Sequence, residues 1–579
     1  MSGAKGARRV AGALVVMVLA ALTYPGAVVT SMIVRLTPPP SISGPAPKGS
    51  MPWLHVEHPG AGQPYIADDM GRLVQLHGAI PAGLLDFWTG TDRSHMDSPP
   101  FYRIDPSAYV DGRCPDNSLS QSNRYPALCQ ADLVQMAALG FNSMRMPLSW
   151  SLLEPERGRF SQTYLDRVAQ VVDWARALGI YVIIDMHQNA YSRYVGWGSG
   201  VDLAYHTGAP AWATFTDGLP SEVLVSGQRE ANPAVFEAFS NFWYNRSGIQ
   251  DEYIAAIAFL AKRFKDDSSV AGYSIFNEPQ PGWNLPPGFE DLLLYPFYRR
   301  AIDAVTGVRD GLPCPSGIFL PVFCGYSDLG VHDVRHLFFM EPGLLRHITD
   351  FPTHLGLPVS SYPNLVYGLH AYTHGFTLER LLTKQDPYRA TYPWGGYDQT
   401  YAFAAREAKA MNAALFVSEF GDDPQYDDLL LTNELLEQER HLLGFAFWTW
   451  KENGDSHNWG VYDPPKTGVS PAPSSGCIRP ERERLLSRVY PRATADFNLT
   501  YHYDAGSGAF SMQASGRSGD APTVVYVPRS VTGNVATSGA ATQSVAAGAD
   551  GSRLVTVTPS GGTFSTTVTS APLTLTGCP

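Results

Sequence analysis

Ser274-Ile-Phe-Asn-Glu-Pro279 and Leu415-Phe-Val-Ser-Glu-Phe-Gly421 are two short stretches that each end a strand-like apolar run with a single glutamate. A carboxyl group at the end of a buried strand costs free energy unless the protein needs it there. Two such groups facing each other in one pocket are the minimum set for hydrolysing a glycosidic bond. Glu278 and Glu419 are therefore candidate catalytic residues, and their strands are the starting point for predicting the fold.

Strand-like runs alternate with helical patterns around these two stretches. The runs lie at Leu73–Ile80, Ser143–Trp150, Tyr181–Gln188, Val270–Pro279, Gly317–Phe323, Leu365–Tyr372, Ala414–Gly421 and Phe445–Glu452. Helical periodicity lies between most of them, at Gln162–Gly179, Asp251–Asp266, Gln399–Asn412 and Asp427–Leu443. This alternation predicts an α/β fold, a (β/α)8 TIM barrel, over residues 72–490. An open doubly wound sheet is the alternative, but no glycine-rich phosphate loop follows the first strand.

The composition changes after Pro491. Ser, Thr, Gly, Val and Ala dominate, and short runs such as Thr523–Val527 and Leu554–Thr558 are separated by turn residues. This pattern is typical of a small all-β sandwich, which we predict over residues 491–579. Its Ser- and Thr-rich faces offer no aromatic platform for a sugar, so we expect this domain to brace the barrel.

The N-terminus has the features of an export signal. Lys5, Arg8 and Arg9 precede an apolar run from Val10 to Val34. Residues 1–35 are predicted as a signal peptide or, because the run is long enough to span a bilayer, as an uncleaved membrane anchor. Residues 36–71 are predicted as a linker and N-terminal extension. We expect a secreted or extracytoplasmic protein, either released or anchored through this apolar segment.

The six cysteines fit an oxidising compartment. They fall as Cys114/Cys129, Cys314/Cys324 and Cys477/Cys578, which suggests three disulfides. None of them has the spacing of metal ligands, so no metal site is predicted.

Charge and composition exclude other classes of protein. The net charge of −12 argues against a nucleic-acid partner, which requires a basic surface. Charged residues make up 17% and aromatic residues 12%, a globular composition rather than a disordered one. We expect a monomer.

Polar and aromatic residues gather at the ends of the predicted strands, where the active site of a (β/α)8 barrel lies. They are Arg145 on the second strand, Asp185-Met-His187-Gln188 on the third, Asn277-Glu278 on the fourth, His370-Ala-Tyr372 on the sixth, Glu419 on the seventh and Trp448 on the eighth. Any one of them has an ordinary structural explanation, such as an ion pair or core filling. Their shared position at one rim indicates a catalytic pocket.

This set, in this order and on these strands, resembles the functional residues of glycoside hydrolase family 5. Within that family the chain is most similar to endoglycoceramidases. The similar segments are Asp185-Met-His-Gln188, Gly208-Ala-Pro-Ala-Trp-Ala-Thr214, Asp217-Gly-Leu-Pro220 and Phe276-Asn-Glu-Pro279, together with the trailing β-sandwich.

The resemblance implies a retaining double displacement with no cofactor. Glu419 would be the nucleophile, with its charge stabilised by Arg145 and Tyr372. Glu278 would be the acid/base, and the carboxyl groups of a retaining pair lie roughly 5–5.5 Å apart.

Further roles follow from the same resemblance. Asn277 would hold the sugar 2-hydroxyl, His187 and His370 would orient sugar or carboxylate, and Trp448 would form the floor of the sugar site.

Two positions depart from the endoglycoceramidase pattern. Asn189 stands where an aspartate sugar contact is typical, and an amide donates where a carboxylate only accepts. The first strand-end loop lacks the expected lysine and offers Asp86 and Trp88 instead. Asp86 and Asn189 are therefore substrate-binding candidates, and the headgroup, including glucosyl versus galactosyl attachment, stays open.

The expected substrate is a glycosphingolipid or other glycolipid in membranes or micelles. The long segment after the third strand is rich in aromatic residues, which can stack on sugars or contact acyl chains. A family 5 β-glycosidase acting on simple glycolipids, steryl glycosides or β-glucans is the alternative. A third hypothesis, an inactive carbohydrate- or lipid-binding barrel, is disfavoured because binding alone does not need both Glu278 and Glu419.

Overall fold

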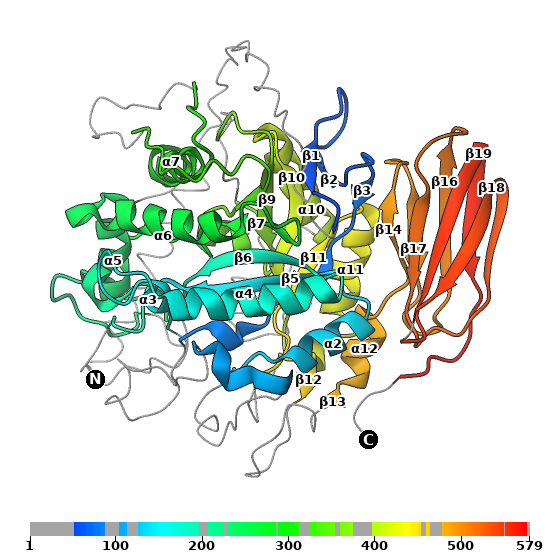
Figure 1. Cartoon of the computed structure of the whole chain (residues 1–579), viewed down its shortest axis with the longest axis horizontal. Coiled ribbons are helices and arrows are strands. Elements are labelled where there is room, and N and C mark those ends of the chain that lie inside the picture. The colour runs from blue at the N-terminus through cyan, green and yellow to red at the C-terminus, as the bar shows by residue number, and fades with distance from the viewer. Residues whose placement is uncertain are drawn as a thin grey trace, which may run out of the picture.

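The computed structural model describes residues 51–86, 104–112, 125–195, 206–224, 229–284, 288–311, 325–351, 353, 359–374, 396–452, 459–463, 477–548 and 550–575. Eight parallel strands form a closed barrel in the order β10-β11-β4-β5-β6-β7-β8-β9. Their bounds are β4 His77–Ala79, β5 Ser143–Ser149, β6 Tyr181–His187, β7 Val270–Ser274, β8 Leu337–Met340, β9 Leu365–His370, β10 Ala414–Phe420 and β11 Phe445–Phe447. The predicted TIM barrel is confirmed, and Figure 1 shows it beside an antiparallel sheet.

The fifth barrel strand differs from the prediction. It is β8, Leu337–Met340, which pairs with β7 and β9. The predicted run Gly317–Phe323 lies outside the described residues. β8 is only four residues long and lies between His336 and Glu341, and such a short run is a weak sequence signal.

Helices surround the barrel (Figure 1). They are α2 Gln130–Ala138, α3 Trp150–Leu153, α4 Gln162–Ala177, α5 Pro233–Trp243, α6 Ile249–Phe264, α7 Tyr295–Thr306, α8 Leu344–Ile348, α10 Tyr397–Ala410, α11 Leu430–Arg440 and α12 Pro480–Leu486. Short 3-10 turns lie at Ala82–Leu84, Pro106–Gly112, Ala211–Ala213, Arg246–Gly248 and Pro424–Tyr426, and a π-turn lies at Glu290–Leu294. The four predicted helices are confirmed with shifts at their ends. Within the described part of the chain, no helix is both long and apolar enough to cross a bilayer.

Local sequence signals explain where several helices begin. The Ser161 side chain accepts a hydrogen bond from the Tyr164 N–H at the start of α4. Asn232 caps α5 in the same way, and Pro233 occupies the first turn, where its missing N–H costs nothing.

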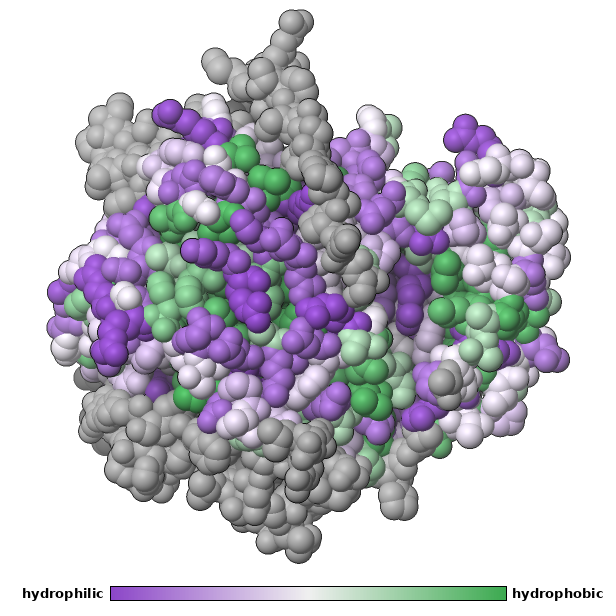
Figure 2. Space-filling view, in the orientation of Figure 1, coloured by the Kyte–Doolittle hydropathy of each residue, from purple (hydrophilic) through white to green (hydrophobic). Residues whose placement is uncertain are grey.

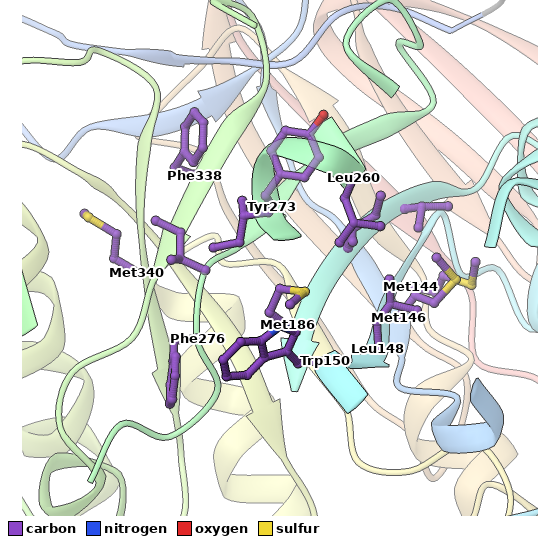
Figure 3. Close-up of a cluster of buried hydrophobic side chains, with 14 of the residues drawn as sticks. Met144, Met146, Leu148, Trp150, Met186, Leu260, Tyr273, Phe276, Phe338 and Met340 are labelled. Carbon is purple, nitrogen blue, oxygen red and sulfur yellow. The ribbon is translucent and has the colours of Figure 1, made fainter. Parts of the chain in front are cut away.

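Alternation along each barrel strand separates two apolar cores. On β5 and β6, Met144, Met146, Leu148 and Met186 face the helices (Figure 3). Ile183 belongs to the other cluster, inside the barrel. Because side chains alternate with a period of two, Arg145, Asp185 and His187 share the interior face with Ile183. The register of these strands thus places charged groups inside the barrel, toward the C-terminal ends of the strands.

A second domain is built around one antiparallel sheet. Its path runs β1-β2-β3-β14-β17-β19-β16-β15, with β18 paired to β19. The bounds are β1 His55–Glu57, β2 Tyr65–Ala67, β3 Leu73–Val74, β14 Tyr490–Thr494, β15 Thr500–Tyr503, β16 Phe510–Gly516, β17 Thr523–Val527, β18 Val535–Ala547 and β19 Arg553–Val568. A separate two-stranded pair, β12 Tyr462–Asp463 and β13 Cys477–Ile478, lies beside the barrel. The C-terminal β domain is confirmed, and it also recruits three strands from the segment before the barrel.

The sheet packs against the N-terminal ends of the barrel strands. His77, at the start of β4, stacks on Tyr490 with ring centroids 3.8 Å apart. The Gln75 side chain donates to the Pro491 carbonyl at 2.9 Å, and Arg488 pairs with Glu439. This contact lies at the opposite end of the barrel from the strand ends that carry Glu278 and Glu419, as a bracing role requires.

The tight pairing of β7 with β8 generates a stability prediction. A Cβ atom at Gly272 would lie 2.0 Å from the Leu337 carbonyl oxygen, so Gly272→Ala must push the two strands apart. We expect a loss of about 1–3 kcal/mol in the free energy of unfolding, from overpacking. Urea or thermal unfolding measures it. Gly60→Ala is the matched control, because a Cβ there meets nothing within 4 Å, and equal stability of the two variants would contradict this account.

Candidate active site

Arg145 is the centre of the polar network at the strand ends. Its side chain is fully buried. One terminal nitrogen donates to Glu419 Oε2 at 2.8 Å, and the other donates to Glu341 Oε1 at 2.7 Å and pairs with Asp185 Oδ1 at 3.0 Å. The second nitrogen also donates to Asn277 Oδ1 at 2.7 Å. A guanidinium has fixed donor directions, so these bonds orient carboxylates from several strands at once.

Glu419 is held by two donors. Arg145 binds one carboxylate oxygen, and the Tyr372 hydroxyl donates to the other at 2.8 Å. The backbone carbonyl of Glu419 also accepts from the Ala371 N–H at 2.8 Å, which fixes the strand end. Donors on both oxygens favour the ionised form and match the predicted stabilisation of the nucleophile by Arg145 and Tyr372.

Glu278 lies on a strained turn just beyond β7. Its φ of 42° is in the left-handed region, which is uncommon for residues other than glycine. The Gln188 amide donates to the Glu278 carbonyl at 3.0 Å, and Glu341 accepts from the Glu278 N–H at 2.8 Å. The Glu278 carboxylate pairs with His370 Nδ1 at 2.9 Å. The turn therefore aims the Glu278 carboxylate at the pocket, where it pairs with His370.

The two catalytic candidates face each other. Glu278, His370 and Glu419 each place one oxygen or nitrogen atom within 4.8 Å of the other two. This proximity fits the separation of a retaining pair. Glu341, His347 and His370 form a second trio with the same spacing. Both trios resemble metal ligand sets, but the Arg145 guanidinium beside them makes a divalent cation unfavourable.

Glu341 is the main site residue that sequence reasoning missed. It directly follows β8, the fifth barrel strand, which the sequence pattern predicts at residues 317–323 instead. The signal was present, because the apolar run Leu337–Met340 ends in a glutamate just as the other two stretches do. His347, on α8, was missed as well; it packs on His370 with ring centroids 4.3 Å apart.

His187 and Trp448 form one wall of the site. Their rings are parallel within 5° and 5.6 Å apart. His187 Nδ1 pairs with Asp185 Oδ2 at 2.9 Å, while Nε2 lies 3.5 Å from the Asn189 amide nitrogen. An amide nitrogen can only donate, so Asn189 presents a hydrogen-bond donor to His187 Nε2. The structure thus brings three of the predicted substrate contacts together.

Asn277 and Asp86 are more constrained than the sequence suggested. The Asn277 Oδ1 is taken by Arg145, and its amide donates to the Gln188 carbonyl at 2.9 Å, which leaves one amide hydrogen for a sugar. Asp86 accepts hydrogen bonds from Ser151 and Thr207 and pairs with Arg193 at 3.2 Å. Asp86 therefore fastens the segment after β6 to the first strand end, and its expected sugar contact stays a prediction. Trp88 lies outside the described residues.

The charges of the site shift the pKa values of the catalytic groups. Burial raises the pKa of Glu419, against the charges of His370 and Arg145, which lower it. Burial also acts to raise the pKa of Glu278, but the hydrogen bond and charge of His370 outweigh it and lower that pKa. Burial would lower the pKa of His370, yet the charges of Glu341 and Glu419 and the bond to Glu278 raise it to about 10. In the free site the proton of the His370–Glu278 pair therefore resides on the imidazole.

The six predicted cysteine partners are only partly within the described residues. Cys129 and Cys477 are disulfide-bonded. Cys114, Cys314, Cys324 and Cys578 lie outside the described residues, so the pairing scheme stays a prediction.

Comparison with known proteins agrees with the geometry. Residues 115–305 match the family model of cellulase, glycosyl hydrolase family 5. Endoglycoceramidase I of Rhodococcus hoagii (strain 103S) is 25% identical over 465 residues, 74% of this chain and 80% of that protein.

Two solved structures share the whole architecture. An endogalactoceramidase has a TM-score of 0.63 and 25% identity, covering 90% of this chain and 100% of that one. Endo-glycoceramidase II from Rhodococcus sp., in complex with ganglioside GM3, has a TM-score of 0.62 and 25% identity, covering 88% of this chain and 99% of that one.

The predicted resemblance is confirmed by these matches. The family model covers the second to fourth barrel strands, and Glu278 lies within its span. Glu419 lies beyond the span of the family model. Together, the family match over residues 115–305, the relatives and the facing carboxylates indicate a glycosidase whose barrel is similar to that of glycoside hydrolase family 5.

Proposed function

We propose that this enzyme hydrolyses the β-glycosidic bond between a sugar chain and ceramide, with retention of configuration. The observation that carries the proposal is the pair Glu278 and Glu419, within 4.8 Å of each other in a barrel shared with endoglycoceramidases. The retaining outcome is supported by this proximity, since an inverting pair is spaced more widely to admit a water.

The first step forms a covalent intermediate. Glu419 attacks the anomeric carbon while Glu278 gives its proton to the glycosidic oxygen, and the C–O bond to the lipid breaks. Arg145 and Tyr372 hold the attacking carboxylate in place and favour its ionised state. The free lipid alcohol then leaves.

The second step restores the enzyme. Glu278, now ionised, takes a proton from a water molecule, whose oxygen attacks the anomeric carbon and displaces Glu419. Two displacements on one carbon give net retention. His187, Trp448 and the remaining Asn277 amide hydrogen lie where they can contact the sugar during both steps.

Exposed apolar side chains support a lipid-linked substrate. Trp283 is 51% exposed and packs edge-on against Phe236 of α5, whereas Val223 and Leu224 are 39% and 46% exposed in the segment leading to that helix. Figure 2 shows that green, hydrophobic patches also reach one face of the molecule. Large apolar side chains left in water on such segments are suited to contact acyl chains in a membrane or micelle.

We also propose export and action as a monomer outside the cytoplasm. The support is the basic N-terminus followed by an apolar run, and the disulfide bonding of Cys129 and Cys477. Pairings Cys114–Cys129, Cys314–Cys324 and Cys477–Cys578 would complete three disulfides.

Substrate choice tests the proposal directly. Wild-type enzyme is incubated with a fluorescent ganglioside, glucosylceramide, a steryl glucoside and a β-glucan, and products are separated by chromatography. We expect release of intact oligosaccharide from the ganglioside, with the β-anomer appearing first by NMR. Release of glucose alone, from glucosylceramide or steryl glucoside, would favour the simple β-glycosidase instead.

Substitution of each glutamate should lower kcat in a different way. Glu419→Gln removes the nucleophile and should lower kcat at least about 10³-fold on every substrate. Glu278→Gln should lower kcat about 10²–10⁴-fold on a glycolipid but far less, in the first step, on a dinitrophenyl glycoside, whose leaving group needs no proton. Glu434→Gln, a buried carboxyl on α11 away from the site, is the control. Equal losses for Glu278→Gln on both substrates would contradict its role as the acid.

The Tyr372 hydroxyl should set the acid limb of the pH profile. Tyr372→Phe removes a donor to ionised Glu419, so the pKa of Glu419 rises further. The nucleophile must be ionised, and activity is therefore lost earlier as pH falls. A bond to a charged group corresponds to a shift of about one to two pH units in kcat/KM. An unchanged acid limb would show that Tyr372 does not act through Glu419.

A further inference from the structure

Glu341 occupies a prepared position beside the catalytic pair. It is 1% exposed, and the Tyr298 hydroxyl clamps its backbone, donating to the Glu341 carbonyl at 2.8 Å and accepting from its N–H at 3.3 Å. Gly368 on β9 leaves room for the side chain, because a Cβ there would lie 3.3 Å from Glu341 Cγ. A buried carboxylate held this firmly requires several partners.

The two carboxylate oxygens of Glu341 serve opposite halves of the site. Oε1 accepts from Arg145 at 2.7 Å, and Arg145 in turn binds Glu419. Oε2 accepts from the Glu278 N–H at 2.8 Å and pairs with His370 Nε2 at 3.2 Å. The Glu341 side chain thus connects Arg145, the cation beside the nucleophile, with Glu278 and its partner His370.

We propose that Glu341 is a positioning residue that holds the Glu278 turn in place and keeps the catalytic proton loaded on the His370–Glu278 pair. The proposal rests on the proposed function, because it assigns Glu278 as the acid/base. Glu341 acts at two points, the backbone of Glu278 and the ring of His370.

The backbone contact restrains a turn that needs support. A φ of 42° at Glu278 is sparsely populated for a residue with a side chain. The Glu341 carboxylate engages the N–H on one side of this residue, and the Gln188 amide engages its carbonyl on the other. Because both bonds come from other strand ends, the direction of the Glu278 side chain depends on them.

The ring of His370 lies between two carboxylates. Glu278 is on its Nδ1 side at 2.9 Å, and Glu341 is on its Nε2 side. His347 stacks on the ring and accepts the His370 backbone N–H at its own Nδ1, at 3.1 Å. The titratable and charged groups that face His370 are Glu278, Glu341, His347, Glu419, Arg145, Asp185 and Tyr372. Among them Glu341 contributes the largest effect that raises the pKa of His370.

The proton moves over short distances in this arrangement. The Nδ1 proton of the imidazolium passes to Glu278 Oε1, and Glu278 passes it to the glycosidic oxygen as the C–O bond breaks. His370 is then neutral and keeps its Nε2 proton, directed at Glu341. In the second step the proton released by water returns to Glu278 and then to Nδ1, so no proton is gained or lost over the cycle.

The test compares Glu341→Gln with Glu341→Asp and with Glu434→Gln. Glu434 is an equally buried carboxyl that accepts from Tyr401 at 2.6 Å, and burial raises its pKa to about 8, so glutamine resembles its protonated form. Loss of the Glu341 charge lowers the proton affinity of the His370–Glu278 pair. The alkaline limb of kcat/KM should therefore move about one to two pH units toward acid in Glu341→Gln.

Leaving-group dependence separates this role from a structural one. Glu341→Gln should lose about 10-fold or more activity on a glycolipid at pH 7, with a smaller loss in the first step on a dinitrophenyl glycoside. Glu341→Asp keeps the charge and should restore most of the alkaline limb, and Glu434→Gln should match wild type. Equal losses on both substrates with unmoved pH limbs would overturn the proposal.

A direct titration decides the matter independently of the substrate. Nitrogen-15 NMR of the His370 ring in the full chain should show a lower pKa in Glu341→Gln than in wild type and an intermediate one in Glu341→Asp. An unchanged His370 titration overturns the proposal. If wild type cleaves none of the glycolipids, the proposed function fails, while this titration still reports on Glu341.

Discussion

The buried guanidinium of Arg145 is the interaction on which the rest of the site depends. It contacts Asp185, Glu341 and Glu419, which come from three different barrel strand ends. Without it, these carboxylates would repel one another in a medium that screens charge poorly, and leaving one ionised group unpaired there costs about 3–5 kcal/mol. The barrel can therefore hold several acidic groups at one rim because Arg145, on β5, lies among them and balances their charge.

The barrel places these charged groups together because side chains alternate between the two faces of each strand. Ile183 fills the interior lower down, and Asp185 and His187 follow on the same face at steps of two residues. At the other end of the barrel the antiparallel sheet covers His77 with Tyr490, beside the ion pair of Arg488 and Glu439. The sheet packs away from the strand ends, which carry groups that burial alone would exclude.

Much of this was predictable, and the failures have physical causes. Long apolar runs that end in a polar residue revealed Glu278 and Glu419, because a buried strand tolerates a carboxyl group only at its end. Glu341 was missed because four apolar residues are too short a run to stand out beside residues 317–323. The partners of Asp86 could not be predicted, because Ser151 and Thr207 come from other segments and such pairing is set by the fold rather than by local pattern.

In the proposed mechanism Glu278 serves as acid and then as base, and the charge balance of the site accounts for both roles. In the free enzyme the charge of Glu419 helps to raise the pKa of His370, which keeps a proton on the His370–Glu278 pair. When Glu419 becomes bonded to the sugar, that charge is consumed, and the proton affinity of the pair falls. Glu278 has by then lost its proton to the departing lipid. The pKa of Glu278 is lowered and the pKa of Glu419 is raised in the site before substrate arrives. Formation of the covalent bond to Glu419 then prepares Glu278 to act as the base.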